Sequence, residues 1–188
     1  YALSARLAFQ YLKAEGISPR YTPQGSLQLG KQVFQRLHNH VGSYQQADTA
    51  GYQILLNYRF SQSSLSPAPT ITLKEVLAGR LKSEDVRDRI VLIGVTAPSS
   101  KDYLATPYGQ RIPGVFIQAQ MVSQLLSAVK DDRTPIGVWA WQVEILWIWG
   151  WAVMGGVLVW RCRSVPWLLG WEIVALGTLT GLCFYGLT

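Results

Sequence analysis

Two groups of polar side chains follow apolar runs of the sequence, and their types suit the binding of a small ligand. The first group follows the run 54–56 and the second follows the run 90–94. An amide, a guanidinium, hydroxyls and a carboxylate together offer both hydrogen-bond donors and acceptors. The ligand-binding candidates are Asn57, Arg59, Thr96, Ser99, Asp102 and Thr106.

The loop 101–107 has two interpretations, and the residues leave both open. In the structural interpretation, Asp102 caps nearby backbone N–H groups, and Thr106 before Pro107 sets an extended turn. In the functional interpretation, Asp102 and Arg59 face a ligand, a small molecule or another stimulus, across a crevice.

No catalytic or metal site is recognisable in the sequence. Neither of the glycine-rich motifs that cradle nucleotide phosphates is present. His38 and His40 have no carboxylate at metal-ligand spacing, and Ser99 lacks the glycine elbow of a serine nucleophile. We expect no catalysis, no cofactor and no metal within this segment.

Charge is distributed unevenly along the chain. Of 17 Lys and Arg residues and 11 Asp and Glu residues, two of each group lie beyond residue 138, so residues 1–138 carry the whole net charge of +6. The basic residues are scattered singly, without the clusters and interleaved aromatic residues of a nucleic-acid-binding surface. We therefore expect no nucleic-acid partner.

Helix signals are clear at three places before the C-terminal tail. Apolar residues at three- and four-residue spacing predict amphipathic helices over 2–16 and 115–129. Thr72 and Glu75 have the spacing of a capping box, which predicts a short helix that ends at Gly79.

Strand signals lie between these helices. Continuous apolar runs predict buried strands over 52–58 and 90–94, and a short edge strand is expected around 27–29. Strands that alternate with helices and are apolar throughout are typical of parallel sheets. We expect an α/β fold over residues 1–135, with a mostly parallel sheet covered by helices on both faces and a ligand crevice at the carboxyl ends of its strands.

The C-terminal tail is almost free of charge and holds every tryptophan of the chain. Its apolar runs, 136–160 and 165–188, are each long enough to cross the hydrocarbon core of a bilayer, for which about 20 residues suffice. They predict a domain of two transmembrane helices, 136–188, joined by a short turn and embedded in the lipid bilayer.

Small residues recur at four-residue spacing in both predicted spans. Such positions let helix backbones approach closely in a membrane. We expect a homo-oligomer formed through the membrane helices, packed at Ala152, Gly156, Gly177 and Gly181.

The charges flanking the first span predict its orientation. The turn carries Arg161 and Arg163 without an acidic residue, whereas the charges of 130–133 cancel. Because short basic loops stay cytoplasmic, we expect a multi-pass protein of the cell membrane with residues 1–135 outside the cytoplasm. No export signal is visible at Tyr1, so we expect a segment of a longer protein.

Short motifs follow one another in a fixed order along the chain: 54–59, 90–94, Thr96-Ala97, Asp102, Thr106-Pro107 and Pro113-Gly114-Val115. This ordered series resembles the C-terminal half of CHASE2 domains. The chain departs from the family's usual pattern at Gln118 and Gln120, where members often have His and Asn; glutamine keeps a hydrogen-bonding carboxamide there.

The resemblance implies a bacterial extracytoplasmic sensory domain, typically followed by about three membrane helices. A stimulus would then be passed through these helices to an effector elsewhere in the protein, such as a kinase, a nucleotide cyclase or a caspase-like domain. Two alternatives are a membrane-anchored enzyme and a structural oligomerisation module, each with its active part elsewhere in the chain.

Overall fold

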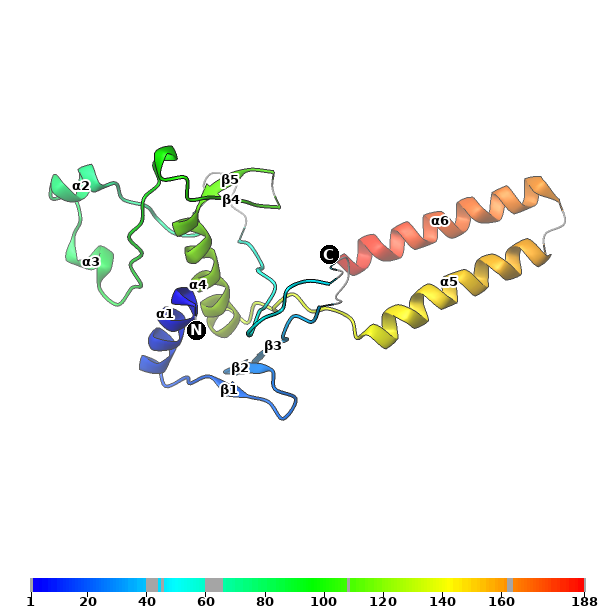
Figure 1. Cartoon of the computed structure of the whole chain (residues 1–188), viewed down its shortest axis with the longest axis horizontal. Coiled ribbons are helices and arrows are strands. Elements are labelled where there is room, and N and C mark those ends of the chain that lie inside the picture. Colours follow the sequence, from blue (N-terminus) through cyan, green and yellow to red (C-terminus); the bar gives the residue numbers. More distant parts are fainter. Residues whose placement is uncertain are drawn as a thin grey trace. The chain divides into compact units, whose positions relative to one another are not determined.

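Figure 1 shows the computed structural model of the chain, which describes residues 2–39, 44, 46–59, 66–107, 109–161 and 164–187. The chain divides into two compact units, Tyr1–Gly137 and Val138–Thr188. His40 and two residues of the predicted cytoplasmic turn, Cys162 and Arg163, lie outside the described residues.

The first unit combines helices with short antiparallel strands. Strands β1–β3 form one sheet and strands β4–β5 form another. In chain order, the elements are α1 (Leu3–Ala14), β1 (Arg20–Tyr21), β2 (Leu27–Leu29), β3 (Gln32–Phe34), α2 (Leu73–Leu77), α3 (Ser83–Val86), the 3-10 turn η1 (Pro98–Ser100), β4 (Tyr103–Ala105), β5 (Arg111–Pro113) and α4 (Gly114–Lys130).

The three helices predicted for this unit are confirmed. Helices α1 and α4 differ from their predicted bounds by at most two residues at each end. At α2 the Thr72 side chain accepts a hydrogen bond from the Glu75 N–H, and the Glu75 carboxylate accepts one from the Thr72 N–H. Gly79 follows α2 with φ +71°, the left-handed conformation that ends many helices.

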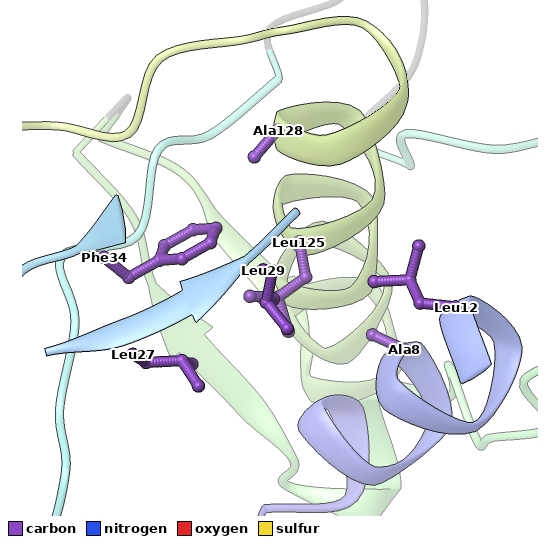
Figure 2. Close-up of a cluster of buried hydrophobic side chains, with 7 residues drawn as sticks. All are labelled: Ala8, Leu12, Leu27, Leu29, Phe34, Leu125 and Ala128. Atoms are coloured by element: carbon purple, nitrogen blue, oxygen red, sulfur yellow. The ribbon is translucent and has the colours of Figure 1, made fainter. Parts of the chain in front are cut away.

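The hydrophobic core of the first unit lies where α1, α4 and the β1–β3 sheet meet (Figure 2). Antiparallel pairing sets Leu27 opposite Phe34, so that both side chains enter the core from the sheet. A fully buried leucine or phenylalanine contributes about 1.5–3 kcal/mol, so this cluster fixes α4 against the rest of the unit. Its members are Ala8, Leu12, Leu27, Leu29, Phe34, Leu125 and Ala128.

The predicted parallel sheet is wrong. In the described part of the chain both sheets are antiparallel, and neither contains 52–58 or 90–94. Neither run is helical. The backbone of 52–58 is bound by side chains of α4. No hydrogen bond joins the backbone groups of 90–95 to any described residue. Apolar composition favours a buried extended strand, whereas a sheet also needs a neighbouring backbone.

The second unit consists of two helices, α5 (Trp141–Arg161) and α6 (Val165–Leu187). Helix α5 has 21 residues, about 31 Å of helix axis, which is sufficient for the hydrocarbon core of a bilayer. By length and composition it is the one candidate span among the described residues, and α6 contains a shorter apolar stretch, Leu169–Tyr185. Spanning by α6 stays a prediction.

Three tryptophan side chains contact one another at the start of α5 and just before it. Trp147 lies edge to face with Trp139 at 5.8 Å and with Trp151 at 5.7 Å between ring centroids. A Cβ atom added at Gly156, Gly177 or Gly181 would meet no described atom within 4 Å. Helix packing through these positions and Ala152 stays a prediction.

Candidate functional site

The N-terminal end of α4 holds Asp102, one of the two charged candidates. The main-chain carbonyl of Asp102 accepts a hydrogen bond from the Gly114 N–H at 3.0 Å. Its carboxylate oxygens lie 2.5 and 2.6 Å from the position that a Cβ atom on Gly114 would occupy. A negative charge next to the first turn of a helix is stabilising, but no hydrogen bond joins the Asp102 carboxylate to a described backbone N–H, so the capping role of Asp102 stays a prediction.

Three further candidates surround this end of α4 in turns. The Tyr103 hydroxyl donates to the Thr96 carbonyl at 2.7 Å, and Ser99 lies exposed within η1. The Thr106 hydroxyl and N–H both donate to the Gln110 carbonyl, at 2.8 and 3.0 Å, and so close the turn between β4 and β5. The structure thus uses Thr96 and Thr106 to shape the loop that precedes α4.

Two glutamines on α4 hold the extended segment 55–59 in the manner of a neighbouring strand. Gln120 accepts a hydrogen bond from the Arg59 N–H at 2.9 Å and donates to the Arg59 carbonyl at 3.1 Å. One turn further, Gln124 accepts from the Asn57 N–H at 3.2 Å and donates to the Leu55 carbonyl at 2.9 Å. Both glutamines are buried, each about 4% exposed, so these four bonds replace water as the partners of the segment's backbone.

The C-terminal end of α4 gathers Asn57 and Arg59 with residues that the sequence did not single out. Arg59 forms an ion pair with Asp131 at 3.2 Å. The Nη2 atom of Arg133 donates to the Asn57 side-chain oxygen at 2.7 Å and to the Tyr58 carbonyl at 3.0 Å. We call Asn57, Arg59, Asp131 and Arg133 the linker cluster, because α4 ends at Lys130 and the chain continues from there to α5.

A cleft of about 350 Å³ lies beside the linker cluster, above one face of α4. Its lining combines apolar side chains of α4, Ala119, Val122 and Leu126, with charged side chains, which we call the rim. Apolar side chains together with polar and charged groups can contact a small molecule. The charged rim residues are Arg59, Asp88, Arg89, Lys130 and Asp131.

Lys130 joins this rim to α1. Its ammonium group donates to the Glu15 carboxylate at 2.7 Å and lies 5.1 Å from the centre of the Tyr11 ring. The hydrogen bond to Glu15 raises the pKa of Lys130 above its ordinary value. Lys130 is therefore cationic at neutral pH and ties the end of α4 to α1.

The candidates therefore fall into two groups at opposite ends of α4, whose 17 residues span about 25 Å. Arg59 lines the cleft and Asp102 does not, so the structure does not bring these two side chains together. A binding role for the six candidates stays a prediction. Among the described residues, no group of His, Cys, Asp and Glu side chains could hold a metal ion.

Sequence reasoning missed Gln124, Asp131 and Arg133 as parts of the site. One signal was available for the glutamines. Gln120 and Gln124 are four residues apart and therefore share one face of the helix, next to the buried apolar residues Ile117, Leu125 and Ala128. Polar residues on a buried helical face must find hydrogen-bond partners, and here they find a strand-like backbone.

Comparison with known proteins gives one finding. The sequence model of the CHASE2 domain matches residues 1–157, and it covers most of the 188 residues. No curated protein and no solved structure matches the chain. Together with a long apolar helix after the first unit, this match identifies the chain as a member of the CHASE2 family of extracellular sensory domains, which are not catalytic.

Proposed function

We propose that this chain is the input unit of a bacterial multi-pass membrane receptor, with residues 1–135 outside the cytoplasm. In this proposal a small molecule binds in the cleft, and the membrane helices pass the stimulus to an effector outside this segment. The observation that carries the proposal is the linker cluster, because it ties one wall of the cleft to the residues that lead into α5.

The ion pair at the rim of the cleft suits a reversible response. The side chains of Arg59 and Asp131 are 44% and 61% exposed, and exposed ion pairs contribute only about 0–1 kcal/mol. An anionic group of a ligand can therefore displace Asp131 from Arg59 at little cost. Displacement would release Asp131, the first residue after α4, from the wall of the cleft.

A thermal-shift screen tests the cleft. Small carboxylates and phosphates would be added to the chain in lipid nanodiscs, with Arg59→Ala as the test variant and Arg80→Ala as the matched control. Arg80 also pairs with a carboxylate, that of Glu75, at 3.7 Å, but it does not line the cleft. A cleft ligand stabilises the native chain and the Arg80→Ala variant but not Arg59→Ala; equal stabilisation of all three would place binding elsewhere.

Side-specific thiol labelling in intact cells tests the location. One variant of the full-length parent protein keeps Cys162 alone, and another has Ser99→Cys as its single cysteine, with Cys162 and Cys183 replaced. We expect an impermeant reagent to label Ser99→Cys but not Cys162. The opposite pattern would put the first unit in the cytoplasm and favour the membrane-anchored enzyme.

The other alternative, a structural oligomerisation module, predicts a different combination of labelling and binding results. The first unit would be labelled from outside, but no compound would bind the cleft in the screen. In that case, joining copies of the chain through the membrane helices would be the function of the segment.

A further inference from the structure

Arg133 lies in an unusual environment for a cation. Its Nη2 atom has two neutral acceptors, the Asn57 side chain and the Tyr58 carbonyl. Its Nη1 atom is buried and has no hydrogen-bond partner in the described part of the chain. Within that part, no carboxylate lies within ion-pair distance of Arg133, because Asp131 pairs with Arg59 instead.

Such a guanidinium is held but incompletely satisfied. A buried N–H group without a partner lowers the stability of the arrangement that buries it. If the segment 57–58 moves, Arg133 loses two hydrogen bonds, but its Nη1 atom gains access to water. The free-energy difference between the bound and released arrangements is therefore smaller than two charge-assisted hydrogen bonds alone would give.

The contacts of Arg133 join two parts of the chain that are far apart in sequence. On one side, residues 57–58 belong to the segment that Gln120 and Gln124 hold against α4. On the other side, the Arg133 N–H donates to the Ser127 carbonyl at 3.2 Å, and the Asn57 amide group donates to the Thr134 carbonyl at 3.5 Å. These bonds fix the course of the chain as it leaves α4.

We infer that Arg133 is a coupling residue: its guanidinium clamps the chain that leaves α4 to the segment 57–58, so that displacement of this segment releases the chain leading to α5. The inference rests on the proposed function for the meaning of that release, since Arg59, the next residue of the segment, lines the cleft. The clamp itself is a property of the first unit and is independent of any stimulus.

Coupling through a clamp must act in both directions. Loss of the Arg133 guanidinium should loosen 55–59, and loss of the Asn57 acceptor should loosen 131–137. A side chain that only fills space at the end of α4 would loosen its own surroundings but not the distant partner segment.

Amide hydrogen exchange of the whole chain in phosphatidylcholine nanodiscs measures both directions. The variants are Arg133→Gln and Asn57→Ala, and Arg36→Gln is the matched control. Asn57→Asp keeps the acceptor of Arg133 but removes the amide donor to Thr134, so exchange in 131–137 should stay slow in that variant if the Arg133 bond is what holds this segment. Arg36 also donates from its guanidinium to a carbonyl, that of Thr49, at 3.4 Å in an exposed region.

We expect exchange in 55–59 to accelerate about tenfold or more in Arg133→Gln, and exchange in 131–137 to accelerate similarly in Asn57→Ala. Helix α1 should keep its native exchange in both variants, and Arg36→Gln should leave both segments unchanged. Acceleration confined to the substituted segment in either variant would overturn the inference.

Two further arms keep the outcomes separable. If Arg133→Gln accelerates exchange throughout the first unit, Arg133→Lys replaces it. Lysine keeps the charge and one donor direction, so we expect a smaller acceleration in 55–59 than in Arg133→Gln. Unchanged exchange of 131–137 in Asn57→Ala would still refute coupling. If exchange shows the clamp but no compound binds the cleft, the sensor proposal fails and the clamp stands. If a compound binds while exchange shows no reciprocity, the clamp fails alone.

Discussion

Replacing Gln120 by leucine tests whether a glutamine side chain stands in for a missing neighbouring strand. The carboxamide makes two hydrogen bonds to the backbone of Arg59, at 2.9 and 3.1 Å, each of which contributes about 0.5–1.5 kcal/mol. Leucine has a similar size and is apolar, so the substitution removes the bonds while keeping the volume. We expect the free energy of unfolding of the first unit to fall by about 1–3 kcal/mol.

Gln118 provides a matched control two residues away. Its Oε1 atom is buried and has no partner among the described residues, so Gln118→Leu removes a buried unsatisfied group. That change should leave stability unaltered or raise it by up to about 1 kcal/mol.

A urea titration of the whole chain in a mild detergent, followed by far-ultraviolet circular dichroism, measures both variants. The helices of the second unit retain their signal, and the first transition reports the first unit. If Gln120→Leu lowers stability no more than Gln118→Leu does, the two hydrogen bonds of Gln120 do not hold Arg59 against α4, and the Gln120 side chain does not stand in for a neighbouring strand.

Gly94→Ala should destabilise the first unit by about 1–3 kcal/mol, because the new Cβ atom would lie 2.6 Å from a side-chain atom at the start of α4. In the control Gly137→Ala the new Cβ atom meets nothing within 4 Å. This control should change stability by less than about 0.5 kcal/mol in the same titration. The pKa of Glu75 lies below its ordinary value because of the backbone hydrogen bond at the helix cap. The stabilisation of α2 by this carboxylate is therefore present above the ordinary glutamate pKa and is lost as pH falls through the lowered pKa. Carboxyl carbon chemical shifts follow this titration. The pKa of Lys130 is raised by its hydrogen bond to Glu15, so this link between α4 and α1 is complete below the ordinary lysine pKa and is lost as pH rises through the raised one. In the same urea titration, the stability of the first unit should fall over that alkaline range in the native chain, and Glu15→Gln should lack this loss.

Contrary outcomes are equally specific for these three. Equal stability of the two glycine variants would mean that the backbone at Gly94 can move away from α4 without strain. A Glu75 pKa at the ordinary glutamate value would mean that the capping box does not form in solution. Persistent pH dependence after Glu15→Gln would assign the alkaline transition to another group.

Local signals were sufficient to predict α1, α2 and α4, whereas the four-residue helix α3 was not predicted. The capping box at Thr72 and Glu75 and the proline before Gly114 act through backbone groups within a few residues. The spacing of apolar residues also identifies α1 and α4, since one buried stripe follows from helical periodicity alone.

Pairing of strands could not be predicted, because it depends on what lies beside an extended segment. The run 90–94 has the composition of a buried strand, yet Ile93 is 96% exposed. The three-residue strand β4 lies within the predicted loop 101–107, and β5, also of three residues, was not predicted. Strands of this length are too short for a side-chain alternation to be recognised; β2, equally short, was predicted at 27–29 because turn residues flank it.

The candidate site was partly predictable for the same reason. Asn57 and Arg59 follow an apolar run, and this placed them correctly at one end of an extended segment. The order of motifs in the sequence contains no information on which end of α4 each motif meets, and the structure separates Arg59 from Asp102 along that helix. Arg133 lies in no motif, and its role follows only from contacts that span more than seventy residues of sequence.

The placement of the tryptophans has an optical consequence. All eight lie between Trp139 and Trp171, and therefore in the second unit, whereas the first unit has tyrosine as its main fluorophore. Selective excitation of tryptophan reports the second unit alone. A compound shown to bind the first unit that also shifts tryptophan emission has changed the surroundings of the second unit. Transmission across this chain can thus be followed in purified protein by its own fluorescence, without knowledge of the effector.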